Sequence, residues 1–313
     1  MRIVRLLAAA TAAFAYLLVA LSPIVRITGS GMGCGDHWPL CNGRLIPRLD
    51  NLAVTIEWGH RMAVVGLTAL VVALLAAAWA FRRAPGAAGP GGVLRPATLA
   101  AVLLVVQSLL GAVTVWLELP TGVVVIHLLN AMALLAAALV AALRTFHRGE
   151  APVAASGSRS GPSAYVAAGL GGVALLLGAL TANLHAGTAC QGFPLCNGRV
   201  WPAAGAAGLV HLHWMHRLVA YALALHLAGM VIGTWRRDEA TRVRWATALA
   251  AGVLALHVAV AAAMVLEFLP LALRATHAAL GALLWVTLVY LTWTVAGTAT
   301  PRAERAAPNG ASR

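Results

Sequence analysis

The sequence contains no lysine and only 9 acidic residues, so all 22 of its basic residues are arginines. Charged residues make up 10% of the chain and hydrophobic residues 61%, whereas soluble domains are about a quarter charged and about half apolar. This balance excludes an ordinary soluble protein and predicts an integral membrane protein. The net charge of +13 is typical of nucleic-acid-binding proteins. Because the arginines lie between apolar segments and not along one face, no nucleic-acid partner is expected.

Apolar runs long enough to cross a hydrocarbon core of about 30 Å recur along the chain. They cover residues 6–25, 54–81, 98–116, 121–143, 164–182, 209–235, 246–266 and 271–295. Arg2 and Arg5 ahead of the first run are also typical of a signal peptide. Since its removal would leave seven helices and break a repeat of four plus four, we predict eight membrane-spanning helices.

A duplicated unit organises the chain. The block Pro-Leu-Cys-Asn-Gly-Arg at 39–44 returns unchanged at 194–199, and a His-Arg pair follows each copy. The repeat predicts an all-α integral membrane fold of eight transmembrane helices, arranged as two tandem four-helix bundles related by a pseudo-two-fold axis along the membrane normal. The predicted parts are an N-terminal half at 1–147, a cytoplasmic linker at 148–162, a C-terminal half at 163–297 and a cytoplasmic tail at 298–313.

Arginines are concentrated on one side of the predicted helices. The N-terminus, the segments 82–97, 144–163 and 236–244 and the C-terminal tail hold fifteen arginines, against four on the opposite side. Positive residues mark the cytoplasmic side of a membrane protein. Both termini are therefore predicted to be cytoplasmic, and both cysteine-bearing loops are predicted to face outward.

Four histidines occupy matching places in the two halves, His60 with His216 and His127 with His277. Each lies about 10 Å below the outer surface, at about 1.5 Å per residue. Ionisable side chains are costly inside a membrane, and two histidines at one depth on two helices suit axial ligation of a haem iron. We predict a haem in each half. Interhelical hydrogen bonding is the alternative for any one histidine, and zinc is disfavoured because neither half gathers a compact set of N and S ligands.

Arg61 and Arg217 directly follow two of these histidines. The guanidinium fork matches a carboxylate with two hydrogen bonds. Both arginines are therefore candidate partners of haem propionates, with snorkelling to the lipid headgroups as the alternative.

The two copies differ beside their histidines. Glu57 stands one helix turn before His60, whereas His213 stands at the equivalent place before His216. A carboxylate beside a metal ligand can move protons or stabilise a developing cation. This difference predicts that the first copy reacts with a substrate while the second holds a redox cofactor. A structural carboxylate that pairs with Arg61 or with a neighbouring helix is the alternative.

A second difference sets Gln107 in the first half against His257 in the second, each thirteen residues before a matching proline. Packing alone is sufficient to explain this weaker difference.

Cysteines form two pairs, Cys34 with Cys41 and Cys190 with Cys196. Outward-facing loops lie in an oxidising compartment, where a disulfide within each loop is expected. Such a bond across a short loop contributes about 2–3 kcal/mol. A structural staple and a redox-active thiol pair near the haem both stay open.

In combination, these motifs resemble the haem A synthase family. The resemblance rests on the duplicated eight-helix plan, the outer-loop cysteine pairs, the Glu-x-x-His-Arg motif at 57–61 and one matched histidine in each of the fourth, sixth and eighth helices. It spans nearly the whole chain. It implies oxidation of the C8 methyl group of haem O to the formyl group of haem A by successive hydroxylations, for use in a-type terminal oxidases.

The resemblance also implies roles for single residues. His216 and His277 would bind a haem b cofactor in the C-terminal half. The N-terminal half would receive haem O as substrate at His60 and His127, with Glu57 as the essential carboxylate. The first cysteine pair is common to the family, and the second occurs in only some of its branches.

Expected partners follow from the same resemblance. They are haem O and haem A, the enzyme haem O synthase, oxidase assembly factors and membrane lipid, and a homo-oligomer is compatible with the sequence. The expected location is the cell membrane of a prokaryote, with a multi-pass chain.

Two other functions fit parts of the pattern. A di-haem b-type membrane electron-transfer cytochrome without haem-modifying chemistry has no need of the difference between Glu57 and His213. A membrane thiol oxidase usually requires closely spaced cysteines such as Cys-x-x-Cys, and the spacings here are wider.

Overall fold

The computed structural model describes residues 1–84, 87–89, 91–146 and 160–296. Within these ranges the chain is helical and forms no strand beyond isolated bridges. The elements are α1 (Arg2–Leu21), α2 (Pro23–Ile27), η1 (Ser30–Met32), α3 (Leu52–Ala80), α4 (Leu94–Trp116), α5 (Thr121–Phe146), α6 (Gly161–Asn183), η2 (Ala186–Thr188), α7 (Gly208–Arg236), α8 (Thr241–Leu266) and α9 (Leu271–Ala296).

The eight predicted spans are confirmed among the described residues. The first of them comprises both α1 and α2, which are separated at Ser22. Pro23 has no N–H to continue the helical hydrogen bonding, and the N–H (2.9 Å) and the hydroxyl (2.6 Å) of Ser22 both donate to the carbonyl oxygen of Leu18. The interruption lies near the end of the span away from the N-terminus, where Ser22 lies close to the predicted ligand His60.

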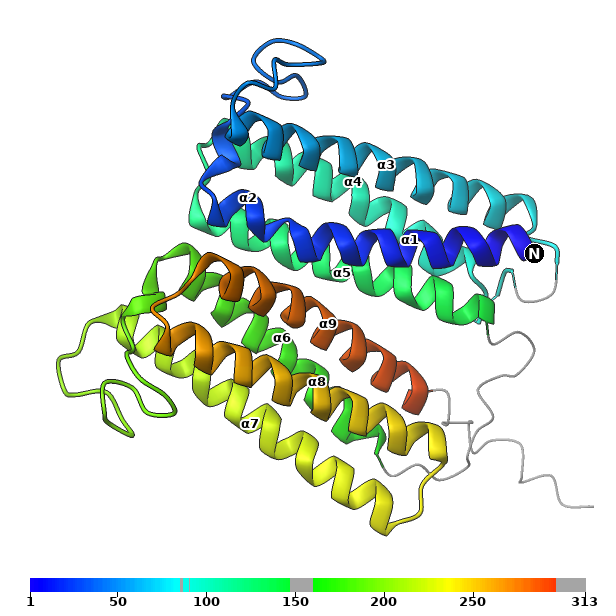
Figure 1. Cartoon of the computed structure of the whole chain (residues 1–313). Helices are drawn as coiled ribbons and strands as arrows, with labels where there is room; N and C mark the ends of the chain where they lie inside the picture. Colours follow the sequence, from blue (N-terminus) through cyan, green and yellow to red (C-terminus); the bar gives the residue numbers. More distant parts are fainter. Residues whose placement is uncertain (85–86, 90, 147–159, 297–313) are drawn as a thin grey trace, which may run out of the picture.

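Figure 1 shows the helices gathered in two groups. α1, α3, α4 and α5 pack together, and α6, α7, α8 and α9 form the second group. The groups meet through α1 and α5 on one side and α6 and α9 on the other. Trp285 in α9 donates its indole N–H to the carbonyl oxygen of Met132 in α5 (2.9 Å). The boundaries of the two halves and the symmetry axis between them stay predictions.

Alanines and leucines lie between the helices, and other large apolar side chains face outward. Ala8, Ala78, Ala97 and Ala141 are fully buried in one cluster of the first group, and alanines allow helix backbones to approach closely. Leu225, by contrast, is 76% exposed. Exposure of apolar side chains is costly in water, so this surface is suited to lipid.

Two long loops lie at the end of the molecule away from the N-terminus (Figure 1). The first, 28–51, connects α2 to α3, and the second, 184–207, connects α6 to α7. Each contains the repeated block, closed by a β-bridge and by the predicted disulfide. The bridges are Cys41–Arg44 and Cys196–Arg199, and the disulfides are Cys34–Cys41 and Cys190–Cys196.

The predicted linker and tail lie largely outside the described residues, as do the arginines at 148, 159, 302, 305 and 313. Because α6 begins at Gly161, the last residues assigned to the linker belong to this helix.

Candidate functional site

Glu57 lies in α3 beneath the first cysteine loop. The residue is 4% exposed, and its carboxylate accepts hydrogen bonds from the N–H of Cys34 (2.8 Å) and from Nη2 of Arg61 (2.5 Å). A buried charge is tolerated only when it is paired and hydrogen-bonded. Both conditions are met, so the structure holds Glu57 as an anion in a fixed position.

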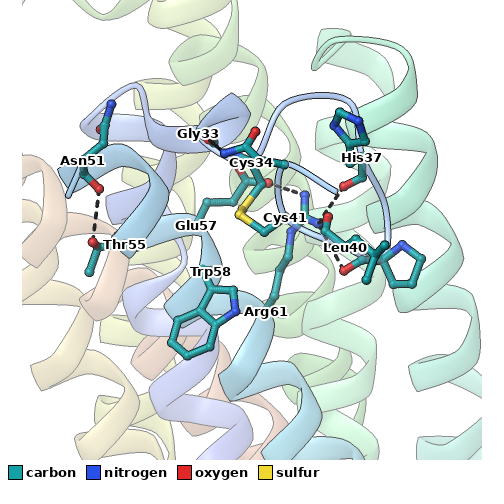
Figure 2. Close-up of a disulfide and its surroundings, with 12 residues drawn as sticks. Gly33, Cys34, His37, Leu40, Cys41, Asn51, Thr55, Glu57, Trp58 and Arg61 are labelled. Carbon is teal, nitrogen blue, oxygen red and sulfur yellow. Dashed lines mark hydrogen bonds and ion pairs between the residues drawn. A yellow bond between two sulfur atoms is a disulfide. The ribbon is translucent and has the colours of Figure 1, made fainter. Parts of the chain in front are cut away.

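Arg61 connects α3 to the loop. Its Nη1 donates to the carbonyl oxygens of His37 (2.9 Å) and Leu40 (2.7 Å). Figure 2 shows Glu57 and Arg61 next to the disulfide, with Arg61 reaching the loop carbonyls. The pairing of Glu57 with Arg61, expected as the alternative to a chemical role, is therefore observed. Contact of Arg61 with a propionate stays a prediction.

The second loop is supported without a carboxylate. His213, at the place of Glu57, donates from Nδ1 to the carbonyl oxygen of Ala186 (3.0 Å) and accepts at Nε2 from Nε of Arg217 (3.4 Å). These two bonds require a neutral imidazole. Arg217 donates further to the carbonyl oxygens of Cys190, Gly192 and Leu195. The second half thus keeps the arginine and lacks the anion.

His216 in α7 is oriented by the backbone of α6. Its Nδ1 donates to the carbonyl oxygen of Ala174 (3.1 Å). A Cβ at position 178 would lie 2.9 Å from Cε1 of the ring, so Gly178 leaves the space that His216 occupies. A bond from Nδ1 fixes the tautomer and leaves Nε2 unprotonated, as a metal ligand requires.

His60 has a different neighbour at the matching place. Ser22 precedes Gly178 by 156 residues, the offset that also separates His60 from His216. The Ser22 hydroxyl donates to the carbonyl oxygen of Leu18, and its oxygen lies 3.4 Å from Nδ1 of His60. Leu18 is the counterpart of Ala174 at this offset. The Ser22 hydroxyl therefore donates to the carbonyl oxygen that corresponds to the one bonded by His216. His60 is held by a longer contact to a side chain.

A cavity in the second group of helices is lined by four histidines. These are His213, His216, His257 and His277. The rings of His257 and His277 are 4.2 Å apart between centroids. Apolar side chains complete the lining, among them Leu223, Leu254 and Leu284. The two predicted ligands of this half therefore reach one cavity, with His257 as a neighbour to which the sequence pattern assigned no role beyond packing.

In the first group of helices, His127 in α5 lies against Gln107 in α4. Nε2 of His127 lies 3.0 Å from the amide nitrogen of Gln107, and Asn130 donates to the amide oxygen of Gln107 (2.7 Å). The sequence pattern assigned only a weak difference to Gln107 and gave no role to Asn130 or Ser22. One signal for Asn130 exists, because residues three apart share a helix face.

The ligand set of the second half fits a haem. Its two imidazoles line one largely apolar cavity, and the buried Nδ1 of His277 has no hydrogen-bond partner among the described residues. His216 and His277 would hold the iron, and a haem bound there would supply one-electron redox chemistry.

Comparison of the sequence with known proteins identifies a family and several relatives. A family model described as cytochrome oxidase assembly protein, COX15-CtaA, matches residues 5–289. The chain is similar to the haem A synthase of Alkalihalophilus pseudofirmus, with 34% identity over 72% of this chain and 74% of the relative. It is 33% identical to the haem A synthase of Symbiobacterium thermophilum over 93% of this chain and 95% of the relative. For the haem A synthase of Shouchella clausii, the identity is 31% over 88% and 91% of the two chains.

Proposed function

Since the chain belongs to the COX15-CtaA family of cytochrome oxidase assembly proteins, we propose that it is a haem A synthase of a prokaryotic cell membrane. The substrate is haem O, whose C8 methyl group becomes the formyl group of haem A for a-type terminal oxidases. In each of two successive hydroxylations, the methyl carbon loses two electrons to an external oxidant and one C–H bond is replaced by C–OH, with the hydrogen leaving as a proton. The resulting geminal diol loses water to give the aldehyde.

The observation that carries this proposal is the single buried anion beneath the two loops. Glu57 is fixed by Arg61 and by the Cys34 N–H, whereas the second half has the neutral His213. A fixed carboxylate one turn from an iron ligand can accept the proton that leaves the methyl carbon or stabilise positive charge that develops there. In this assignment, His60 and His127 bind the substrate haem in the N-terminal half, 1–147.

The C-terminal half, 163–297, holds the resident haem b through His216 and His277. Arg61 and Arg217 remain candidates for the propionates, because a guanidinium has five N–H groups. Arg61 donates three of these N–H groups to loop carbonyls and to Glu57. Arg217 donates four of them to loop carbonyls and to His213. The remaining N–H groups are the proposed donors to a propionate.

We further assign both cysteine loops to the outer face of the membrane and both termini to the cytoplasm. The arginine distribution supports this orientation. Haem O synthase and oxidase assembly factors are the proposed partners, since the substrate must arrive from the enzyme that farnesylates haem.

The test uses a host that makes haem O but lacks haem A. Haems are extracted from membranes containing the wild-type chain, Glu57→Gln or Glu118→Gln, and are separated by chromatography. Glu118 is the matched control, since it is an exposed carboxylate at the outer end of α4. We expect haem A or its hydroxylated precursor from the wild type and the control, and about 10²–10⁴-fold less from Glu57→Gln.

Two results would contradict the proposal in different ways. If all three chains yield only haem B with a bis-histidine spectrum, the protein is a di-haem electron carrier. If Glu57→Gln keeps the wild-type yield, the carboxylate serves only as the structural partner of Arg61.

A further inference from the structure

A chain of side-chain hydrogen bonds in the first group of helices ends on His127. Nδ2 of Asn130 donates to the carbonyl oxygen of Leu103 (2.9 Å) and to Oε1 of Gln107 (2.7 Å). The amide nitrogen of Gln107 then lies 3.0 Å from Nε2 of His127. Leu103 and Gln107 belong to α4, while His127 and Asn130 belong to α5.

The direction of these bonds is fixed by their first member. A backbone carbonyl only accepts, so the NH₂ group of Asn130 must face Leu103. The same NH₂ group meets Gln107, which must therefore present its oxygen there and its own NH₂ group to His127. Nε2 of His127 consequently accepts, and the ring proton lies on Nδ1, a buried atom without a hydrogen-bond partner among the described residues.

This arrangement occupies the atom that would bind iron. Nε2 offers a metal the same lone pair that here accepts the amide hydrogen. We infer that Gln107, held in place by Asn130, competes with the substrate iron for Nε2 of His127 and makes this bond readily reversible. Both are positioning residues, and the inference rests on the proposed function, in which the N-terminal half binds haem O.

The second half cannot form the same chain. At the offset of 150 that relates His127 to His277, Gln107 is replaced by His257 and Asn130 by Leu280. The leucine side chain has no hydrogen-bond donor, and the His257 ring lies against the His277 ring. His277, the predicted ligand of the resident haem, therefore has no amide at the place from which Gln107 competes for His127.

Reversibility is what a substrate site requires. A haem that enters as substrate must also leave as product, whereas a resident cofactor stays bound. When the iron leaves, the Gln107 amide again donates a hydrogen bond to Nε2 of His127. The buried nitrogen is therefore not left without a partner, and this stabilises the state after release.

The test is a titration of the purified protein, which retains its resident haem, with hemin, the ferric form of haem B. Binding of the second equivalent is followed in the Soret band, and its dissociation is measured by transfer to apomyoglobin. Gln107→Met removes the donor and nearly conserves volume, and Asn130→Leu introduces the residue found at 280. Ser108→Ala is the control, since among the described residues the Ser108 hydroxyl bonds to Leu104 of its own helix alone.

We expect Gln107→Met to bind the second hemin about two- to tenfold more tightly and to release it correspondingly more slowly, as loss of one competing hydrogen bond predicts. Asn130→Leu should change both values in the same direction by a smaller factor, and Ser108→Ala should match the wild type. If Gln107 merely orients His127, its removal weakens binding. Weaker or unchanged binding in Gln107→Met, or no second equivalent in any form, overturns the inference.

Failure of the proposed function gives a different result. In that case the wild type makes no haem A from haem O, whatever the hemin titration shows. A wild type that makes haem A, together with a Gln107→Met variant that binds hemin no more tightly, rejects the competition alone.

Discussion

The two cysteine loops share a six-residue block, a disulfide and an arginine that donates to loop carbonyls, but they differ in the side chain beneath them. Glu57 is an anion paired with Arg61, and His213 is a neutral imidazole bonded to Arg217. Each copy of the repeat thus has an arginine that holds its cysteine loop. The residue paired with that arginine is charged in the first copy, as Glu57, and neutral in the second, as His213. A structural need for the arginine is thus common to both copies, whereas a need for the carboxylate is not.

The predicted ligands differ in a parallel way. In the second half, His216 is bonded to a backbone carbonyl and His277 lies against another ring. In the first half, a serine hydroxyl and a glutamine amide contact the histidines. His216 alone is thus bonded to the backbone of a neighbouring helix, whereas both histidines of the first half contact polar side chains. This contrast supports a permanent cofactor in one half and a transient substrate in the other.

The largest effect is expected when one ligand is removed from each half. His216→Ala should abolish the haem that is retained through purification, because the iron loses an axial ligand. His60→Ala should keep that haem and lose haem A production. Haem per polypeptide, measured as the pyridine haemochrome, separates the two. Equal loss of haem in both variants would show that the halves bind haem alike.

The parts of the molecule that follow from pattern could be predicted from the sequence. Apolar runs define the eight spans, and the repeat alone reveals the contrast between Glu57 and His213. The contact of Ser22 with His60 could not be foreseen, since it depends on how two helices are rotated about their axes. In a membrane protein both the buried and the lipid-facing sides of a helix are apolar, so hydrophobic periodicity carries little information about that rotation. The bond from the Cys34 N–H to Glu57 likewise depends on how an irregular loop folds back over α3.

An intermediate effect is expected from the two loop arginines. Arg61→Ala leaves the Glu57 carboxylate buried without its cation, the two side chains being 13% and 5% exposed, and removal of one partner of a buried pair costs about 3–5 kcal/mol. Arg217→Ala leaves a neutral imidazole and loop carbonyls without their donor, at a cost of about 1–3 kcal/mol. Thermal unfolding in detergent should show the larger loss of stability for Arg61→Ala.

A double variant controls for the loss of loop contacts. Arg61→Ala with Glu57→Ala removes the unpaired charge and should recover part of the stability. Equal destabilisation by Arg61→Ala and Arg217→Ala, without recovery in the double variant, would mean that the anion does not distinguish the loops.

The smallest effect is expected where a single small residue sets the orientation of each histidine. Gly178→Ser places a Cβ 2.9 Å from Cε1 of His216, so the ring must move and its bond to Ala174 must lengthen. Overpacking of this kind costs about 1–3 kcal/mol, and the resident haem should dissociate faster with an altered Soret band. The reciprocal change, Ser22→Gly, costs about 0.5–1 kcal/mol as a glycine in a helical segment and should leave the resident haem unchanged. An unaltered spectrum in Gly178→Ser would show that α6 does not orient His216, and the amide at His127 would then be the remaining difference between the two ligand pairs.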